Sequence, residues 1–275
     1  MEKVRARIGG HEVGDGCPLL LIAGPCVIES EGQALAHARR VKDLAGRHGI
    51  PVVFKASFDK ANRSSGKSFR GVGLEAGLDV FTRVKAETGL STLTDVHETW
   101  QAEPVGRVVD VLQVPAFLCR QTDLVMACAR HGRSVNVKKG QFLAPRDMRH
   151  AVAKCREAGA ENILLTERGA SFGYGNLVVD MRGLVIMREL GVPVCLDATH
   201  SVQLPGAGGD VTGGERQFVA PLARAAAAVG IDALFAEIHE DPSTARSDGP
   251  NSLDFDMADR LLTDVLRIRR ALGQP

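Results

Sequence analysis

The sequence predicts an α/β protein that forms a (β/α)8 TIM barrel, as one domain over residues 1–275 with residues 1–17 as an N-terminal hairpin extension. The main observation is an alternation of short apolar runs with longer amphipathic segments, at spacings of roughly 20–40 residues. A second observation is that no G-x-G-x-x-G follows a strand, which argues against a dinucleotide-binding sheet. The eight predicted strands are 18–24, 51–57, 90–95, 109–115, 134–139, 162–168, 193–198 and 232–238.

The first predicted element lies before the barrel. Residues 4–14, VRARIGGHEVG, are typical of a small β-hairpin that turns at Gly9-Gly10. We expect this hairpin to close the bottom of the barrel, where the strands begin.

The first strand, PLLLIAG, is followed directly by a helix signal. Apolar residues recur with helical spacing at positions 35, 38, 41, 44 and 45. Ser30 is a suitable N-cap and Gly49 a suitable C-cap, so the helix is expected to run between them. A last helix is predicted over residues 256–273, where its charged residues form either a solvated face or an interface.

Two long loops stand out among the connections. The loop at 58–71, FDKANRSSGKSFRG, is too polar to belong to the core. If it has no functional role, it is interpreted as a flexible surface loop. The loop at 199–218 is rich in glycine. It is interpreted either as a lid that excludes water or as a disordered connection.

Composition excludes several classes of partner. Net charge is +1 and aromatic residues make up 4%, which argues against nucleic acid and anionic membranes. No apolar stretch approaches the ~20 residues that span a bilayer, and the N-terminus lacks the apolar region of a secretory signal. The six cysteines show no CxxC spacing, so they are interpreted as reduced thiols in a cytoplasmic protein.

Polar or reactive residues occur at the end of every predicted strand. In a barrel of this kind, such residues point into the active site. One of them alone would be interpreted as a solvated rim residue, but a complete set favours a functional site. The set is Cys26, Lys55, Asp95, Gln113, Lys138, Arg168, His200 and Glu237.

Five cations fall at strand ends or in the loop after the second strand. Because the overall charge is near zero, this local clustering predicts a small substrate with several negative charges. Arginine supplies planar bidentate contacts to phosphate or carboxylate, and lysine supplies point charges. The bland alternative is a set of surface salt bridges. The cations are Lys55, Lys60, Arg63, Lys138 and Arg168.

A thiol, an imidazole and two carboxylates are predicted to meet at one side of the barrel. Cys26, His200 and Glu237 follow strands one, seven and eight, which are consecutive in a closed barrel, and Asp248 comes shortly afterwards. This donor set suits Zn²⁺, Fe²⁺, Co²⁺ or Mn²⁺. Two alternatives stay open for Cys26: a nucleophile with His200 as its base, or a buried small residue.

Several motifs, in this order, resemble those of the 3-deoxy-D-manno-octulosonate 8-phosphate synthases. They are AGPCVIES, FKASFDKANRSS, TDVHE, LQVPAFLCRQTDL, NVKKGQF, TERGASFGYGNLVVDMR, DATHSVQ and AEIHEDP, and they extend from about residue 18 to residue 255. The segment KANRSS (60–65) is the most specific. The alternative is the related 3-deoxy-D-arabino-heptulosonate 7-phosphate synthases, which use erythrose 4-phosphate and carry a K-P-R-T-S type loop there.

The resemblance implies an enzyme of lipopolysaccharide biosynthesis, a cytoplasmic homotetramer that condenses phosphoenolpyruvate with D-arabinose 5-phosphate and releases phosphate. Lys138 and Arg168 would bind the phosphate of phosphoenolpyruvate, with Lys55 and Lys60 near its phosphate and carboxylate. The acceptor sugar and its phosphate would be held by Asn62, Arg63 and Ser64. From a neighbouring subunit, Arg120 would reach that phosphate and Phe117 would shape the interface, while Asp95 and Gln113 would lie deeper. Catalytic roles would fall to Lys55, Lys60, Asp95, His200 and Asp248.

The resemblance also implies a role for Cys26. The family is divided into a class with Cys at this position, which needs a divalent metal, and a class with Asn, which does not. Cys26 places the chain in the metal-dependent class, and the other ligands would be His200, Glu237 and Asp248.

Two rival interpretations of the function are a Schiff-base aldolase that uses Lys55 or Lys138 and a sugar-phosphate binding barrel without catalysis.

Overall fold

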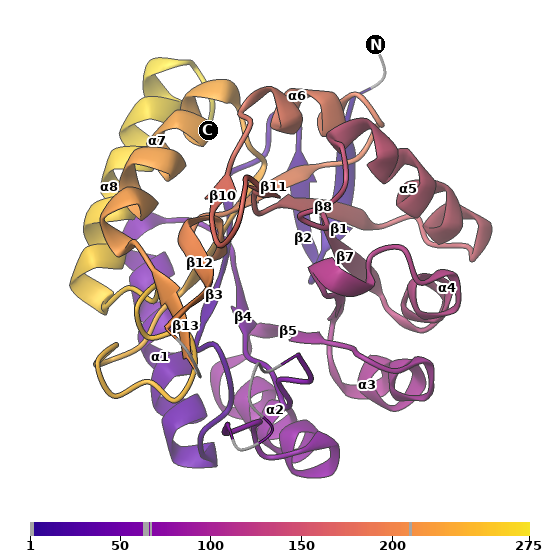
Figure 1. The fold of residues 1–275 in the computed structure, drawn as a ribbon, viewed down its shortest axis with the longest axis vertical. Helices are drawn as coiled ribbons and strands as arrows, with labels where there is room; N and C mark the ends of the chain where they lie inside the picture. The colour runs from indigo at the N-terminus through magenta and orange to yellow at the C-terminus, as the bar shows by residue number, and fades with distance from the viewer. Residues whose placement is uncertain (1–2, 63–65, 67, 209–210) are drawn as a thin grey trace.

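The computed structural model describes residues 3–62, 66, 68–208 and 211–275. Eight parallel strands close into a barrel in the order β11-β14-β3-β4-β5-β6-β7-β8, which confirms the predicted (β/α)8 barrel (Figure 1). Each strand falls inside one of the eight predicted runs. The strands are β3 (Leu20–Gly24), β4 (Val52–Lys55), β5 (Ser91–Asp95), β6 (Val111–Val114), β7 (Ser134–Lys138), β8 (Ile163–Glu167), β11 (Val194–Asp197) and β14 (Ala233–Glu237).

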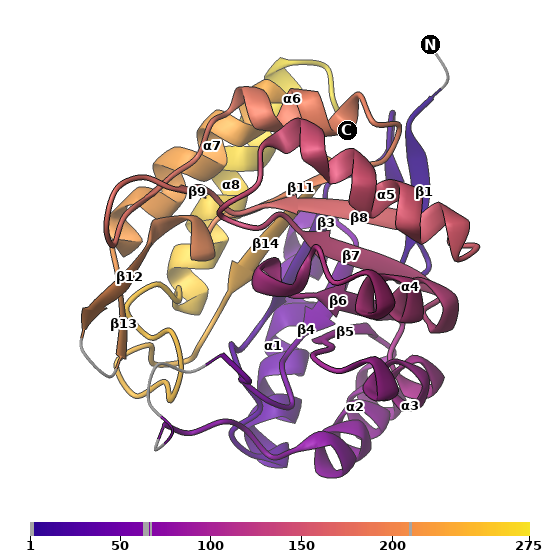
Figure 2. The ribbon, with the colours of Figure 1, turned by 45° about the vertical axis from the view of Figure 1, so that its right-hand side comes forward.

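Helices surround the barrel on its outside (Figures 1 and 2). They are α1 (Glu31–His48), α2 (Leu74–Thr88), α3 (Ala102–Val108), α4 (Thr122–His131), α5 (Met148–Glu157), α6 (Arg182–Arg188), α7 (Val219–Val229) and α8 (Phe255–Ala271). Short 3-10 helices are η1 (Thr99–Gln101), η2 (Ala116–Leu118), η3 (Pro145–Asp147), η4 (His200–Val202) and η5 (Arg216–Phe218). None of the helices in the described ranges is long and apolar enough to cross a membrane.

Helix α1 has the caps that its sequence predicts. The Ser30 side chain accepts a hydrogen bond from the backbone N–H of Gln33, and Gly49 adopts a left-handed conformation with φ 67°. The predicted apolar face is buried except at Leu35, which is half-buried, and Ala34 and His37 complete the buried side.

The predicted N-terminal hairpin is present as β1 (Arg5–Ile8) and β2 (His11–Gly14). It lies against the amino ends of the barrel strands, where the Ser91 hydroxyl donates to the Gly9 carbonyl oxygen at 2.5 Å. Ala6, Ile8 and Val13 join the apolar cluster inside the barrel. The hairpin therefore closes the bottom of the barrel, as expected.

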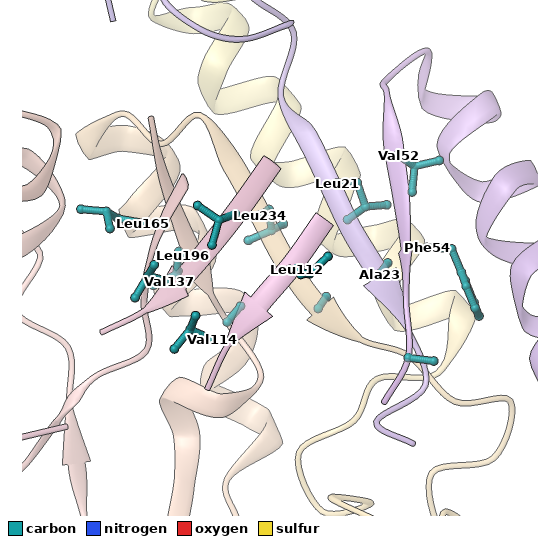
Figure 3. Packing of buried hydrophobic residues seen from close by; sticks show 14 of the residues in the cluster. Leu21, Ala23, Val52, Phe54, Leu112, Val114, Val137, Leu165, Leu196 and Leu234 are labelled. Atoms are coloured by element: carbon teal, nitrogen blue, oxygen red, sulfur yellow. The ribbon is translucent and has the colours of Figure 1, made fainter. Parts of the chain in front are cut away.

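The core has two parts because side chains alternate across the barrel wall. Outward residues such as Leu21 and Phe54 pack against the helices in a large cluster, part of which Figure 3 shows. Inward residues form a smaller cluster within the barrel. That inner cluster includes Leu20, Ile22, Val53, Leu93, Val111, Leu164, Cys195, Ala233 and Phe235.

The described part of the glycine-rich segment at 199–218 has regular secondary structure, which does not fit a disordered connection, and its role as a lid stays a prediction. Its described residues form helices η4 and η5 and an antiparallel pair, β12 (Gln203–Gly208) with β13 (Val211–Gly214). Figures 1 and 2 both place this hairpin beside the loop that precedes α8. A second small pair, β9 (Ala170–Ser171) with β10 (Leu177–Val178), follows β8.

Candidate active site

A cavity of about 470 Å³ lies at the carboxyl ends of the barrel strands. Many of the predicted site residues line it, from strand ends and from the loops that follow them. These are Lys55, Lys60, Asn62, Asp95, Phe117, Lys138, Arg168, His200 and Asp248. Arg63 and Ser64, the other predicted acceptor ligands, lie outside the described residues.

The alternation of inward and outward residues explains why these side chains converge. Two positions beyond an inward apolar residue, the next inward residue of the same strand is polar: Lys55 follows Val53, and Asp95 follows Leu93. The same step leads from Val111 to Gln113 and from Phe235 to Glu237. The apolar layer thus ends where the polar layer of the cavity begins.

Cys26, Glu237 and Asp248 form a buried cluster whose ligand atoms lie within 4.8 Å of one another. Cys26 Sγ lies 3.0 Å from Asp248 Oδ2. The fourth predicted ligand is adjacent, because His200 Nε2 lies 3.5 Å from Glu237 Oε1 and 3.9 Å from Asp248 Oδ2. Strands β11, β14 and β3 are consecutive in the barrel, as the sequence predicts, and this order brings the residues that follow them together.

The chemistry of this cluster fits a divalent cation. Glu237 Oε2 is buried and has no hydrogen-bond partner among the described residues. Burial and the nearby carboxylates of Asp248 and Glu237 raise the pKa of the Cys26 thiol well above its ordinary value. A cation between these groups would supply the missing partner and favour the thiolate, and Zn²⁺, Fe²⁺, Co²⁺ or Mn²⁺ suits this donor set.

Asp197 orients His200 and is a residue that the sequence analysis did not select. Its Oδ2 lies 2.7 Å from His200 Nδ1, and its Oδ1 accepts from the His200 backbone N–H at 2.9 Å. Nδ1 is therefore engaged on the side opposite the cluster, which leaves Nε2 to face Glu237 and Asp248. Burial opposes ionisation of Asp197, but His200 and Lys138 hold its pKa well below the ordinary value.

The cations of the cavity are held by buried acceptors. Lys55 Nζ donates to Glu237 Oε1 at 2.5 Å and to the Cys26 carbonyl oxygen at 2.9 Å. Lys138 Nζ donates to Asp197 Oδ2 at 2.5 Å. Both lysines considered for Schiff-base chemistry are thus paired with buried carboxylates.

Arg168 has hydrogen-bonding capacity left at the cavity. Its Nη2 donates to the His200 carbonyl oxygen at 2.8 Å and to Gln203 Oε1 at 2.5 Å. Its Nε is buried and has no partner within the described part of the chain. A guanidinium with donors in reserve is suited to an anionic group of a substrate.

Asp95 and Gln113 belong to a polar chain that forms the floor of the cavity. Gln113 Nε2 donates to Asp95 Oδ1 at 2.6 Å, and Asn136 Nδ2 donates to Gln113 Oε1 at 2.8 Å. Burial raises the pKa of Asp95, but Lys60, 3.8 Å away, and Lys55 outweigh burial and hold that pKa well below its usual range. Gln113 is buried and does not line the cavity, so it supports Asp95 from below.

Phe117 and Arg120 differ in their relation to the cavity. Phe117 lines it although 55% of its surface is exposed, while Arg120 is exposed and is not among the lining residues. The structure therefore does not bring Arg120 into the site of its own chain.

The lining residues that were missed from sequence include His97, Gln141 and Gln203. His97 is two positions beyond Asp95 in TDVHE, so the inward alternation offered a signal for it. Its Nδ1 is buried without a partner in the described ranges, and burial lowers its pKa. Gln203 follows a short 3-10 turn, where no simple periodicity points to it.

Comparison with known proteins shows which family and which relatives this chain is similar to. A model of the DAHP synthetase I family matches residues 3–270. The chain is 59% identical over 273 residues to a protein of Synechococcus sp. named 2-dehydro-3-deoxyphosphooctonate aldolase, with 99% of this chain and 96% of that protein covered. Proteins with the same name from Syntrophotalea carbinolica and Bordetella petrii are each 56% identical, covering 93% and 95% of this chain and 92% and 94% of the relatives.

Proposed function

The chain belongs to the DAHP synthetase I family, and on that premise we propose that it condenses phosphoenolpyruvate with D-arabinose 5-phosphate to form 3-deoxy-D-manno-octulosonate 8-phosphate and phosphate. It is then a transferase of the aldol type. The name of its relatives denotes this eight-carbon product, which favours arabinose 5-phosphate over erythrose 4-phosphate as acceptor. The observation that carries the proposal is that Lys138, Arg168 and Asp248 line one cavity, and that Asp248 belongs to the Cys26 cluster.

The cations would offset the repulsion between two phosphorylated substrates. Lys138 and Arg168 would receive the phosphate of phosphoenolpyruvate, and Lys55 and Lys60 would lie near its phosphate and carboxylate. Held in this way, carbon 3 of phosphoenolpyruvate attacks the aldehyde carbon of the open-chain sugar. Water adds at carbon 2, and phosphate leaves by cleavage of its C–O bond.

The acceptor would lie toward the mouth of the cavity. Asn62 lines that cavity and would hold the sugar together with Arg63 and Ser64. Asp95 and Gln113, joined by their hydrogen bond, would support the cations from below.

A divalent metal is part of this proposal, held by Cys26, His200, Glu237 and Asp248. When bound, it supplies positive charge that polarises a carbonyl oxygen or orients a water molecule. The residues themselves prepare this site: Asp197 fixes the ring of His200, and Lys55 fixes the backbone of Cys26 and one oxygen of Glu237.

We further propose that the chain acts as one domain, in a cytoplasmic homotetramer that serves lipopolysaccharide biosynthesis. The exposure of Phe117 and Arg120 supports an interface at this rim, where Arg120 would reach the acceptor phosphate of a neighbouring subunit. Sedimentation equilibrium of the wild-type protein and of Arg120→Ala, with the KM for arabinose 5-phosphate of both, tests this arrangement.

The deciding experiment measures phosphate release from phosphoenolpyruvate with arabinose 5-phosphate, before and after treatment with a chelator, and with erythrose 4-phosphate in parallel. We expect turnover with arabinose 5-phosphate that chelation abolishes and added metal restores. Turnover that survives complete metal removal would leave the reaction standing and make Cys26 structural. Turnover with erythrose 4-phosphate alone would favour the seven-carbon product, and borohydride trapping of a substrate adduct would favour a Schiff base on Lys55 or Lys138.

A further inference from the structure

Gln203 lines the cavity and contacts both Arg168 and Asp248, and Asp248 belongs to the Cys26 cluster. Its Oε1 accepts a hydrogen bond from Arg168 Nη2 at 2.5 Å, and its Nε2 donates to Asp248 Oδ1 at 3.0 Å. The other oxygen of Asp248, Oδ2, lies 3.0 Å from Cys26 Sγ. One side-chain amide therefore lies between a guanidinium and a carboxylate of the cluster.

A carboxamide is the suitable group for this place. A guanidinium offers only donors and a carboxylate only acceptors, so the residue between them must accept on one side and donate on the other. Glutamate would repel Asp248, lysine would repel Arg168, and leucine would contact both without a hydrogen bond.

We infer that Gln203 is a positioning residue that couples occupation of the metal site to binding of the phosphate at Arg168. A cation held in part by Asp248 would fix this carboxylate, whose Oδ1 accepts from the Gln203 amide, and the amide in turn accepts from Arg168. By linkage, the phosphate must tighten the metal by the same factor. The inference rests on the proposed function, because that function places phosphate at Arg168 and a metal at Asp248.

A parallel connection limits the size of the expected effect. Asp197 contacts both His200 Nδ1 and Lys138 Nζ, so a second metal ligand and a second cation are joined as well. Removing the Gln203 amide leaves that connection intact. For a typical pair of coupled sites, one ligand changes the affinity of the other by a factor of about 5–150. We therefore expect Gln203→Leu to reduce this factor, while the protein still binds both the metal and phosphoenolpyruvate.

The test measures the affinity of phosphoenolpyruvate in the metal-free and the Cd²⁺-loaded protein by calorimetry, and the affinity of Cd²⁺ with and without phosphoenolpyruvate. In Gln203→Leu we expect the ratio of the two phosphoenolpyruvate affinities to fall at least roughly threefold below that of the wild-type protein. Gln217→Leu is the matched control, because Gln217 is exposed on η5 and contacts Glu215. It should keep the wild-type ratio.

Gln203→Glu provides a second variant that keeps the acceptor for Arg168 and loses the donor for Asp248. It should weaken Cd²⁺ more than it weakens phosphoenolpyruvate in the metal-free protein. The inference would be overturned if a folded Gln203→Leu protein kept the wild-type ratio of phosphoenolpyruvate affinities with and without Cd²⁺. If the leucine variant does not fold, the same result in Gln203→Glu would overturn it. A ratio of one in the wild-type protein would also overturn it, because the two sites would then not be coupled. These outcomes differ from failure of the proposed function, which would appear as a wild-type protein without phosphate release.

Discussion

Lys55 and Glu237 form an ion pair that is closed off from solvent: Lys55 Nζ lies 2.5 Å from Glu237 Oε1, and the two side chains are 1% and 0% exposed. They end strands β4 and β14, on either side of β3. Because Lys55 Nζ also donates to the Cys26 carbonyl oxygen, the pair links three neighbouring strand ends at the cluster of Cys26, Glu237 and Asp248.

Removing the charge of Lys55 should destabilise the protein. In Lys55→Met, Glu237 is left as a buried carboxylate without its cation, and we expect the free energy of unfolding in chelator to fall by about 3–5 kcal/mol. Saturating Zn²⁺ should restore part of that loss, since the metal would supply a new partner. Urea unfolding with and without chelator measures both effects. Lys154→Met, at a more exposed lysine, should change stability by less than about 0.5 kcal/mol.

Cys26 should control the metal more than it controls the fold. We expect Cys26→Ala to weaken Co²⁺ binding by more than about 100-fold, because even outer-shell changes cost 10–100-fold. Loss of the thiolate-to-metal absorption would be the direct spectroscopic sign. Cys17→Ala, at a buried cysteine away from the cavity, should keep that absorption.

Cys26→Asn tests whether the metal mainly positions groups. The resemblance found in the sequence implies that a metal-free class of the family carries asparagine at this position, so we expect part of the turnover to persist in chelator. A folded Cys26→Asn protein with turnover near zero in chelator would contradict this expectation.

His37 should make stability depend on pH. Its side chain is 1% exposed, its Nδ1 lies 2.8 Å from the Gln33 carbonyl oxygen, and its Nε2 accepts from the Glu240 backbone N–H. Both ring nitrogens are thus satisfied in the neutral form. Burial lowers the pKa of His37 and outweighs the hydrogen bond to the Gln33 carbonyl oxygen, which raises it.

Proton linkage determines the direction in which stability changes with pH. The unfolded chain takes up a proton near pH 6.5 while the folded chain resists it, so the stabilisation is present above about pH 6.5 and is lost as pH falls below it. Denaturant unfolding at pH 7.5 and 5.5 measures the loss. His37→Gln should reduce this change in the free energy of unfolding, whereas His131→Gln, at the exposed end of α4, should leave it unchanged. An equal pH dependence of stability in both variants would show that His37 is not its source.

Gly9 should be more sensitive to substitution than Gly10. Both have positive φ, 55° and 83°, so alanine is strained at either position by about 1–2 kcal/mol. A Cβ on Gly9 would also lie 2.7 Å from Val53 Cγ2, whereas a Cβ on Gly10 meets open space. We expect Gly9→Ala to cost about 1–3 kcal/mol more than Gly10→Ala in urea unfolding. An equal loss of stability in the two variants would show that the bottom of the barrel can shift to accommodate a Cβ at Gly9.

Much of the fold could be predicted because it depends on local patterns. Short apolar runs alternating with helical periodicity require a buried parallel sheet with helices outside, and eight such units close it. The caps of α1 and the Gly9-Gly10 turn follow from single residues whose conformational preferences are strong. For the same reason, the polar residues at the strand ends could be selected before their positions were known.

The contacts between those residues were decided by tertiary structure. Strand alternation tells which side chains face inward, but the stagger of the closed barrel decides which of them touch. Asp197 could have been chosen by alternation from Cys195, yet its place between His200 and Lys138 depends on the register of β11 with its neighbours.

Gln203 shows the limit most clearly. Its sequence neighbours form a 3-10 turn and a hairpin, and its partners are 35 and 45 positions away along the chain. By itself the sequence determined the barrel, its hairpin and the kind of chemistry at the strand ends, because these depend on periodicity and residue type. Only the tertiary structure decided that one amide would join Arg168 to Asp248, because that contact requires three loops to meet in space.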